Sequence, residues 1–106
     1  MKFKELTSLQ AHSQAINLMS LALNSFSIQS KELSTVEFKE KSIRVISIVQ
    51  RPELPKYTFF TYDLTIEIKW WGIKIRLYSL ADRKYIDIKT RALLKQHLKD
   101  NLIDND

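Results

Sequence analysis

The feature that most constrains the fold is an alternation of apolar and polar residues that recurs in three successive segments of the second half of the chain. Alternation of this kind places successive side chains on opposite faces of a β-strand. The segments are residues 57–70, 73–80 and 85–89, and their apolar positions are Phe60, Tyr62, Leu64, Ile66, Ile68, Trp70, Ile73, Ile75, Leu77, Ile86 and Ile88. The pattern predicts three antiparallel strands that bury one common face.

The register of the longest hairpin depends on where the chain turns between its two strands. A turn at residues 71–72 gives the predicted cross-strand pairs Ile68–Ile75 and Ile66–Leu77 on the buried face, and Glu67–Arg76 and Lys69–Lys74 on the other face. Two lysines directly opposite each other repel unless an anion lies between them. The predicted register therefore suggests an anion-binding position at Lys69 and Lys74.

Two earlier segments, residues 34–39 and 42–50, also alternate. A turn at Glu40-Lys41 predicts the pairs Phe38–Ile43, Val36–Val45 and Glu37–Arg44. A single bulged strand over the same residues is the alternative, because Glu-Lys is a poor turn sequence.

Residues 8–26 predict an N-terminal helix, because apolar residues recur there at helical spacing and Thr7 with Gln10 matches a capping box. No charged residue occurs between Leu6 and Ser30, so the polar face of this helix carries only amides and hydroxyls. Such groups cost less to desolvate than charges do. The face is a candidate contact with another subunit, and a solvent-exposed surface is the alternative.

Residues 90–103 predict a C-terminal helix with Thr90 as its N-cap, and residues 100–106 are expected to fray because they are polar and acidic. The chain is therefore predicted to be a single α+β domain over residues 1–106. It comprises an N-terminal helix, an antiparallel meander sheet of four to five strands and a C-terminal helix, with both helices on one face of the sheet.

Scarce residue types exclude most kinds of active site. The chain has no cysteine, which excludes disulfides, thiolate metal sites and cysteine nucleophiles. Its single glycine, Gly72, excludes glycine-rich phosphate loops, and two histidines are too few for a typical zinc site. We therefore expect a protein that is not an enzyme, with no catalytic residues, metal, cofactor or small-molecule substrate.

No stretch approaches the roughly 18 apolar residues of a membrane span, and no unbroken apolar segment follows the first basic residues. Together with the absence of cysteine, this predicts a cytoplasmic protein without a membrane partner.

The solvent face of the predicted hairpins combines basic and aromatic side chains in a chain of net charge +5. The predicted partner-binding residues are Lys69, Trp71, Lys74, Arg76, Tyr78, Tyr85 and Lys89. Cations beside stacking rings are typical of nucleic-acid-binding surfaces. Lysine and tyrosine also serve solubility on open sheet faces, and acidic Glu67 and Asp87 in the same area repel phosphate.

A second apolar surface is expected on the sheet face that points away from the main core, and exposed patches of this kind usually mark an interface. The residues predicted for self-association are Ile46, Ile48 and Phe59 on strands and Gln14, Asn17 and Leu21 on the first helix. The leading hypothesis is a small protein-interaction module of inhibitor, immunity or accessory type that binds a macromolecular partner as a homodimer. The alternative is a nucleic-acid-binding protein that uses the basic and aromatic face.

Overall fold

An antiparallel five-stranded sheet lies at the centre of the structure, and its strand order, β2-β3-β4-β5-β6, follows the chain. The computed structural model describes residues 1–23, 32–50 and 59–104. The strands of this sheet are Glu32–Phe38 (β2), Ser42–Gln50 (β3), Phe59–Lys69 (β4), Gly72–Ser79 (β5) and Lys84–Ile86 (β6). The remaining elements are the helices Ser8–Ala22 (α1) and Arg91–Asn101 (α2) and the short strands Lys2–Phe3 (β1) and Ile103–Asp104 (β7). The α+β class and the antiparallel meander predicted from the sequence are confirmed.

The β2–β3 hairpin has the predicted register. Phe38 pairs with Ile43, Val36 with Val45 and Glu37 with Arg44. Lys39 N donates a hydrogen bond to Ser42 O at 2.8 Å and closes the turn, so the alternative of one continuous bulged strand is wrong. An irregularity between Leu33 and Thr35 shifts the register toward the start of β2, and such a bulge discourages further pairing at a sheet edge.

The β4–β5 hairpin has the predicted faces but a different register, because the chain turns at Trp70-Trp71 instead of Trp71-Gly72. Lys69 pairs with Gly72, and Lys74 pairs with Glu67. The predicted Lys69–Lys74 pair is therefore wrong, and so are the other three pairs of that register. Gly72 has φ +142° directly after the turn, a backbone conformation that favours glycine. The slip is two residues, so every strand side chain keeps its predicted face.

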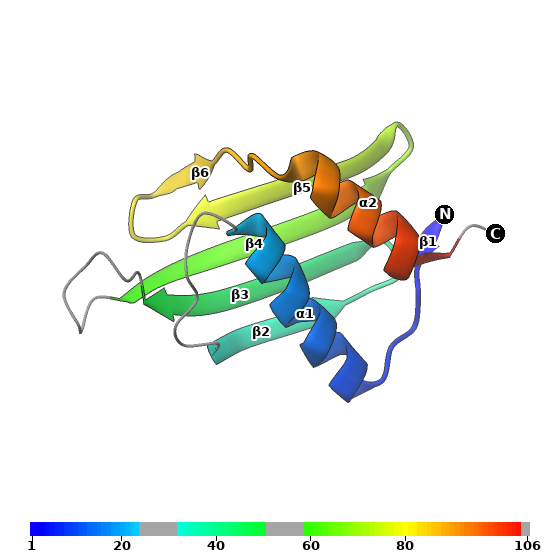
Figure 1. Ribbon diagram of the computed structural model, residues 1–106, viewed down its shortest axis with the longest axis horizontal. Coiled ribbons are helices and arrows are strands. Elements are labelled where there is room, and N and C mark those ends of the chain that lie inside the picture. Colours follow the sequence, from blue (N-terminus) through cyan, green and yellow to red (C-terminus); the bar gives the residue numbers. More distant parts are fainter. Residues whose placement is uncertain (24–31, 51–58, 105–106) are drawn as a thin grey trace.

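The core lies between one face of the sheet, which we call the inner face, and the two helices (Figure 1). Leu64 at the middle of the sheet pairs with Val45 and Leu77, and all three are buried. Both helices cross this face in Figure 1, and their buried residues, including Leu18 and Leu98, belong to the same apolar cluster. Spacing of three and four residues gives each helix the apolar stripe that packs on the sheet.

The ends of the helices carry specific polar contacts. The capping box of α1 is confirmed, since Thr7 N donates to Gln10 Oε1 at 3.0 Å and Gln10 N donates to Thr7 Oγ1 at 3.2 Å. The helix ends at Ala22 with Leu23 as its C-cap, and residues 24–26 of the predicted helix lie outside the described residues. Thr90 is the N-cap of α2, but its hydroxyl donates to Leu21 O at 2.6 Å and makes no cap hydrogen bond. Thr90 therefore joins the two helices.

The first and last described segments pair with each other, which the sequence did not predict. Phe3 pairs with Ile103, and both are buried in the core. Phe3 N also donates to Glu40 O at 2.8 Å, and Lys4 N donates to Leu102 O at 2.9 Å. The expectation that residues 100–106 fray is wrong for residues 100–104, because residues 100 and 101 belong to α2 and the apolar side chains of Leu102 and Ile103 are buried. Residues 105 and 106 lie outside the described ranges.

Candidate functional site

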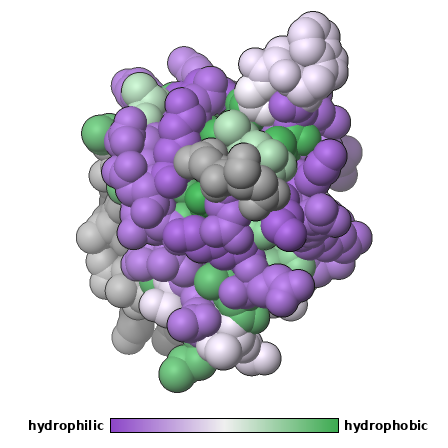
Figure 2. Space-filling model, turned by 90° about the vertical axis from the view of Figure 1, so that its right-hand side faces the viewer, coloured by the Kyte–Doolittle hydropathy of each residue, from purple (hydrophilic) through white to green (hydrophobic). Residues whose placement is uncertain are grey.

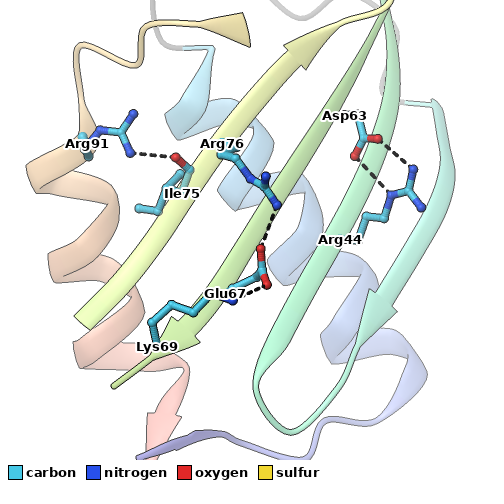
Figure 3. Close-up of polar contacts among 7 residues, drawn as sticks. All are labelled: Arg44, Asp63, Glu67, Lys69, Ile75, Arg76 and Arg91. Carbon is cyan, nitrogen blue, oxygen red and sulfur yellow. Dashed lines mark hydrogen bonds and ion pairs between the residues drawn. The ribbon is translucent and has the colours of Figure 1, made fainter. Parts of the chain in front are cut away.

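The sheet face that points away from the helices carries the candidate functional surface, and we call it the outer face. Figure 3 views this face with α1 and α2 behind the strands. Its residues, from the strand register, are Arg44, Ile46, Ile48, Thr61, Asp63, Thr65, Glu67, Lys69, Lys74, Arg76, Tyr78 and Tyr85. Charges of both signs alternate across neighbouring strands, so the outer face is not a uniformly basic surface.

Glu67 is the centre of the first ionic cluster on the outer face. Its carboxylate contacts Lys69 Nζ at 3.0 Å and accepts a hydrogen bond from Arg76 Nη2 at 2.8 Å (Figure 3). Lys74 occupies the cross-strand position opposite it. The hydrogen bond from Lys69 and the positive charges of Lys69 and Arg76 lower the pKa of Glu67, although burial opposes this shift. One carboxylate therefore binds two of the cations that were predicted to contact a partner.

Arg44 and Asp63 form the second ionic pair, from β3 to β4. Arg44 Nη2 donates to Asp63 Oδ2 at 2.8 Å, and Arg44 Nε donates to Asp63 Oδ1 at 3.3 Å. This two-bond geometry is the strong form of an arginine–carboxylate contact, and the bond to Asp63 raises the pKa of the guanidinium. The Arg44 side chain is nevertheless 50% exposed, so the pair lies on the surface.

The fold brings five of the seven predicted partner-binding residues onto the outer face, namely Lys69, Lys74, Arg76, Tyr78 and Tyr85. Tyr78 and Tyr85 pair across β5 and β6, with ring centroids 5.0 Å apart in an edge-to-face arrangement. Trp71 lies in the β4–β5 turn. Lys89 follows the end of β6, so the prediction that it lies on a strand from 85 to 89 is wrong.

Trp70 is the residue that the sequence placed most wrongly. It was predicted to be buried with Ile68, but it lies in the turn and is 97% exposed, while Trp71 is 56% exposed. The signal that identifies the true turn is Gly72, which supplies the positive φ directly after it.

Some of the predicted self-association residues are exposed or half-buried on the surface, and others contact the core or α2. Ile46 and Ile48 are half-buried on the outer face, and Phe59 is 53% exposed at the start of β4. On α1, Asn17 is exposed, but Leu21 packs against the core. The other polar residue of the set, Gln14, has its Oε1 atom 3.3 Å from His97 Nε2, so part of the uncharged helix face contacts α2 of the same chain.

The hollows of the described surface are lined mainly by polar side chains. One of about 930 Å³ lies between residues 2–6 and the β2–β3 turn. Two smaller ones, of about 300 and 190 Å³, lie beside the ionic clusters of the outer face. Within the described ranges, no group of three or more acidic or histidine side chains has the geometry of a metal site.

The Glu67 cluster gives the folded protein a specific pH dependence. The pKa of Glu67 is lowered from its ordinary value of 4.5 on folding, so its contribution to stability is present above that value. The contribution is lost as the pH falls below 4.5 and the folded protein takes up the proton. We expect Glu67→Gln to be less stable than the wild type at pH 7, with the difference shrinking at pH 3. Urea midpoints measured by circular dichroism test this, and a difference that does not change with pH would contradict it.

Comparisons with protein-family models, with curated proteins and with solved structures gave no match. The function is therefore inferred from the chemistry of the surface. Among the described helices, none is long and apolar enough to cross a membrane.

Proposed function

We propose that the protein is a small, non-enzymatic protein-interaction module that binds a protein partner through the outer face of its sheet. The observation that carries the proposal is the mixed-charge surface of ion pairs around Glu67 and Asp63, with the Tyr78–Tyr85 pair beside it. Fixed charges of both signs give electrostatic complementarity to one protein surface and exclude others. Tyrosine and arginine are also the side chains that contribute most binding energy at protein interfaces.

The ion pairs favour a protein over a nucleic acid as the partner. A phosphate backbone needs free cations, but Arg44 binds Asp63, and Arg76 and Lys69 bind Glu67. The carboxylates of Asp63 and Glu67 would also repel a polyanion that lies on this face. Nucleic-acid binding is the second candidate, supported by the 63% exposed ring of Tyr85 and by Lys74, for which the described part of the chain provides no ion pair.

A homodimer is the form that we propose for the module. Ile46 and Ile48 lie on β3, the second strand of the sheet, and their half-buried side chains on the outer face gain further burial if a second copy packs there. Light scattering of the purified protein gives the oligomeric state directly. An Ile46→Asp variant that lowers the mass from dimer to monomer while keeping its circular dichroism spectrum supports this form, and a monomeric wild type contradicts it.

Photo-crosslinking in cells tests the proposed surface and captures the protein that binds there. A photoreactive phenylalanine analogue replaces Tyr85 on the outer face or Leu93 on α2, and these two positions are equally exposed at 63%. We expect a discrete protein adduct from position 85 and none from position 93. The adduct identifies the partner for binding measurements with purified components.

The purified pair then allows a charge-reversal test. We expect Lys74→Glu to weaken binding about tenfold or more, because this lysine lies in the proposed interface. Lys99→Glu on α2 makes the same charge change away from the outer face and should leave the affinity unchanged. Equal affinities of a folded Lys74→Glu variant and the wild type would remove the outer face from the proposal. An adduct with nucleic acid at position 85 and an affinity that falls steeply with salt would establish the alternative.

A further inference from the structure

The turn between β4 and β5 presents two adjacent indole rings to solvent. Trp70 is 97% exposed and Trp71 is 56% exposed, and they are the only two tryptophans of the chain. We call these two residues the tryptophan turn. Figure 1 shows this turn at the upper right corner of the molecule, above α2. In Figure 2, which views that end of the molecule, a pale group of atoms stands out from a mostly hydrophilic surface at the same height.

The geometry of the hairpin keeps these two rings exposed. The turn has two residues, and the pair Lys69–Gly72 closes it on paired strands. Ile68 N, at the end of β4, donates to Lys41 O at 2.9 Å and so fixes the hairpin to the neighbouring β2–β3 turn. An aromatic side chain buries 150–250 Å² when it finds an apolar environment. The sheet therefore holds two large apolar groups at a position where its own core cannot cover them.

Lysines surround the tryptophan turn. Lys69 precedes it, Lys74 follows it on β5, and the adjacent β2–β3 turn carries exposed Lys39 and Lys41. The acidic residues of the same region are Glu37, Glu40 and Glu67. Glu67 contacts Lys69 at 3.0 Å, and Glu37 contacts Lys39 at 3.7 Å, whereas the described residues provide no ion pair for Lys41 and Lys74. The cations therefore outnumber the acids around the turn, in a chain whose net charge is +5.

From this arrangement we propose that the tryptophan turn binds the surface of a lipid bilayer that contains anionic phospholipids. Tryptophan is enriched at the membrane–water interface because its ring is apolar and its N–H is polar. Lys41 and Lys74, which have no ion pair among the described residues, are the cations available behind the rings to attract negatively charged headgroups. The expectation of no membrane partner rested on the absence of a membrane span, and this mode of binding requires none.

The shape of the turn favours a bilayer over the other partners of exposed tryptophan. Proteins that stack single-stranded nucleic acid on aromatic rings do so along a charged groove, whereas these rings lie on a projecting turn. A tryptophan that dominates a protein interface is surrounded by other contacts that exclude water, and Trp70 is almost completely exposed on all sides. Insertion of the two rings into the headgroup region of a bilayer requires neither a groove on the protein nor protein contacts around the rings. The proposal does not depend on the protein partner of the outer face.

Tryptophan fluorescence tests this proposal at the site itself, since both fluorophores belong to it. The probes are vesicles of phosphatidylcholine alone and vesicles in which about one third of the lipid is phosphatidylserine. We expect a blue shift of the emission with the anionic vesicles, quenching by brominated acyl chains near the headgroups, and weaker binding at high salt. No shift and no co-sedimentation with the anionic vesicles would overturn the proposal.

Variants separate the contribution of the tryptophan turn to vesicle binding from that of the net charge of the protein. We expect the double variant Trp70→Ala, Trp71→Ala to lose about tenfold or more in co-sedimentation with anionic vesicles. Leu93→Ala, which removes an exposed apolar side chain from α2, should bind as the wild type does. Unchanged vesicle binding of the double variant would overturn the proposal. A blue shift with oligothymidine but not with vesicles would assign the turn to nucleic acid instead. If the double variant does not fold, brominated-lipid quenching of the wild type decides the question.

Discussion

Replacing Phe3 with alanine should lower the free energy of unfolding by about 3–5 kcal/mol, the usual cost of truncating a buried phenylalanine. The ring is 3% exposed in the core, and its strand pairs with the last described strand. Small domains are stable by about 5–15 kcal/mol in total, so the variant should lose a large fraction of its stability. Urea denaturation followed by circular dichroism measures the change.

Lys2→Ala is the matched control for this result, because Lys2 is an exposed residue of the same strand. Its free energy of unfolding should stay within about 0.5 kcal/mol of the wild type. A Phe3→Ala variant as stable as Lys2→Ala would mean that β1 does not pack as the structure shows.

Leu64→Ala should cost about 2–5 kcal/mol, because it removes three buried carbons from the middle of the sheet and leaves a cavity. Leu64 is fully buried and pairs with Val45 on one side and Leu77 on the other. The neighbouring Thr65→Ala serves as control, since Thr65 points to the outer face and is only half-buried. Thermal or urea unfolding of both variants gives the comparison, and equal losses would contradict the assignment of inner and outer faces.

The register of β2 and β3 could be predicted because two kinds of signal agree. Apolar residues match across the hairpin at Phe38 and Ile43, and the opposite charges of Glu37 and Arg44 match on the other face. A shift of one residue would expose the apolar set, and a shift of two would break the charge pair.

The register of β4 and β5 was mispredicted by two residues, and alternation alone cannot detect such a shift because all faces are preserved. The charged residues of the two strands did indicate the correct register. The predicted register set Lys69 against Lys74, whereas the observed one pairs Lys74 with Glu67. Treating the repulsion as a sign of a bound anion led away from the simpler explanation, a different turn.

The long-range contacts of the two ends and of the helices could not be read from the sequence. The pairing of Phe3 with Ile103, like the bond from Thr90 to Leu21, joins residues far apart in the chain that have no local pattern in common. For the candidate site, the sequence identified which residues share the outer face. It set Glu67 beside Arg76, and these two side chains do form an ion pair, although their backbone positions are not directly opposite. It did not predict the contact of Glu67 with Lys69 or the pair of Arg44 with Asp63.

The order of the strands along the chain has a consequence for the folding pathway. Each strand of the large sheet pairs only with its neighbours in sequence, so the sheet can grow by successive hairpins with short closing loops. The contact between β1 and β7, in contrast, closes a loop of nearly the whole described chain and has the largest entropic cost. We therefore expect the two ends to join after the rate-limiting step. The Phe3→Ala substitution should then accelerate unfolding and leave the refolding rate almost unchanged in stopped-flow measurements.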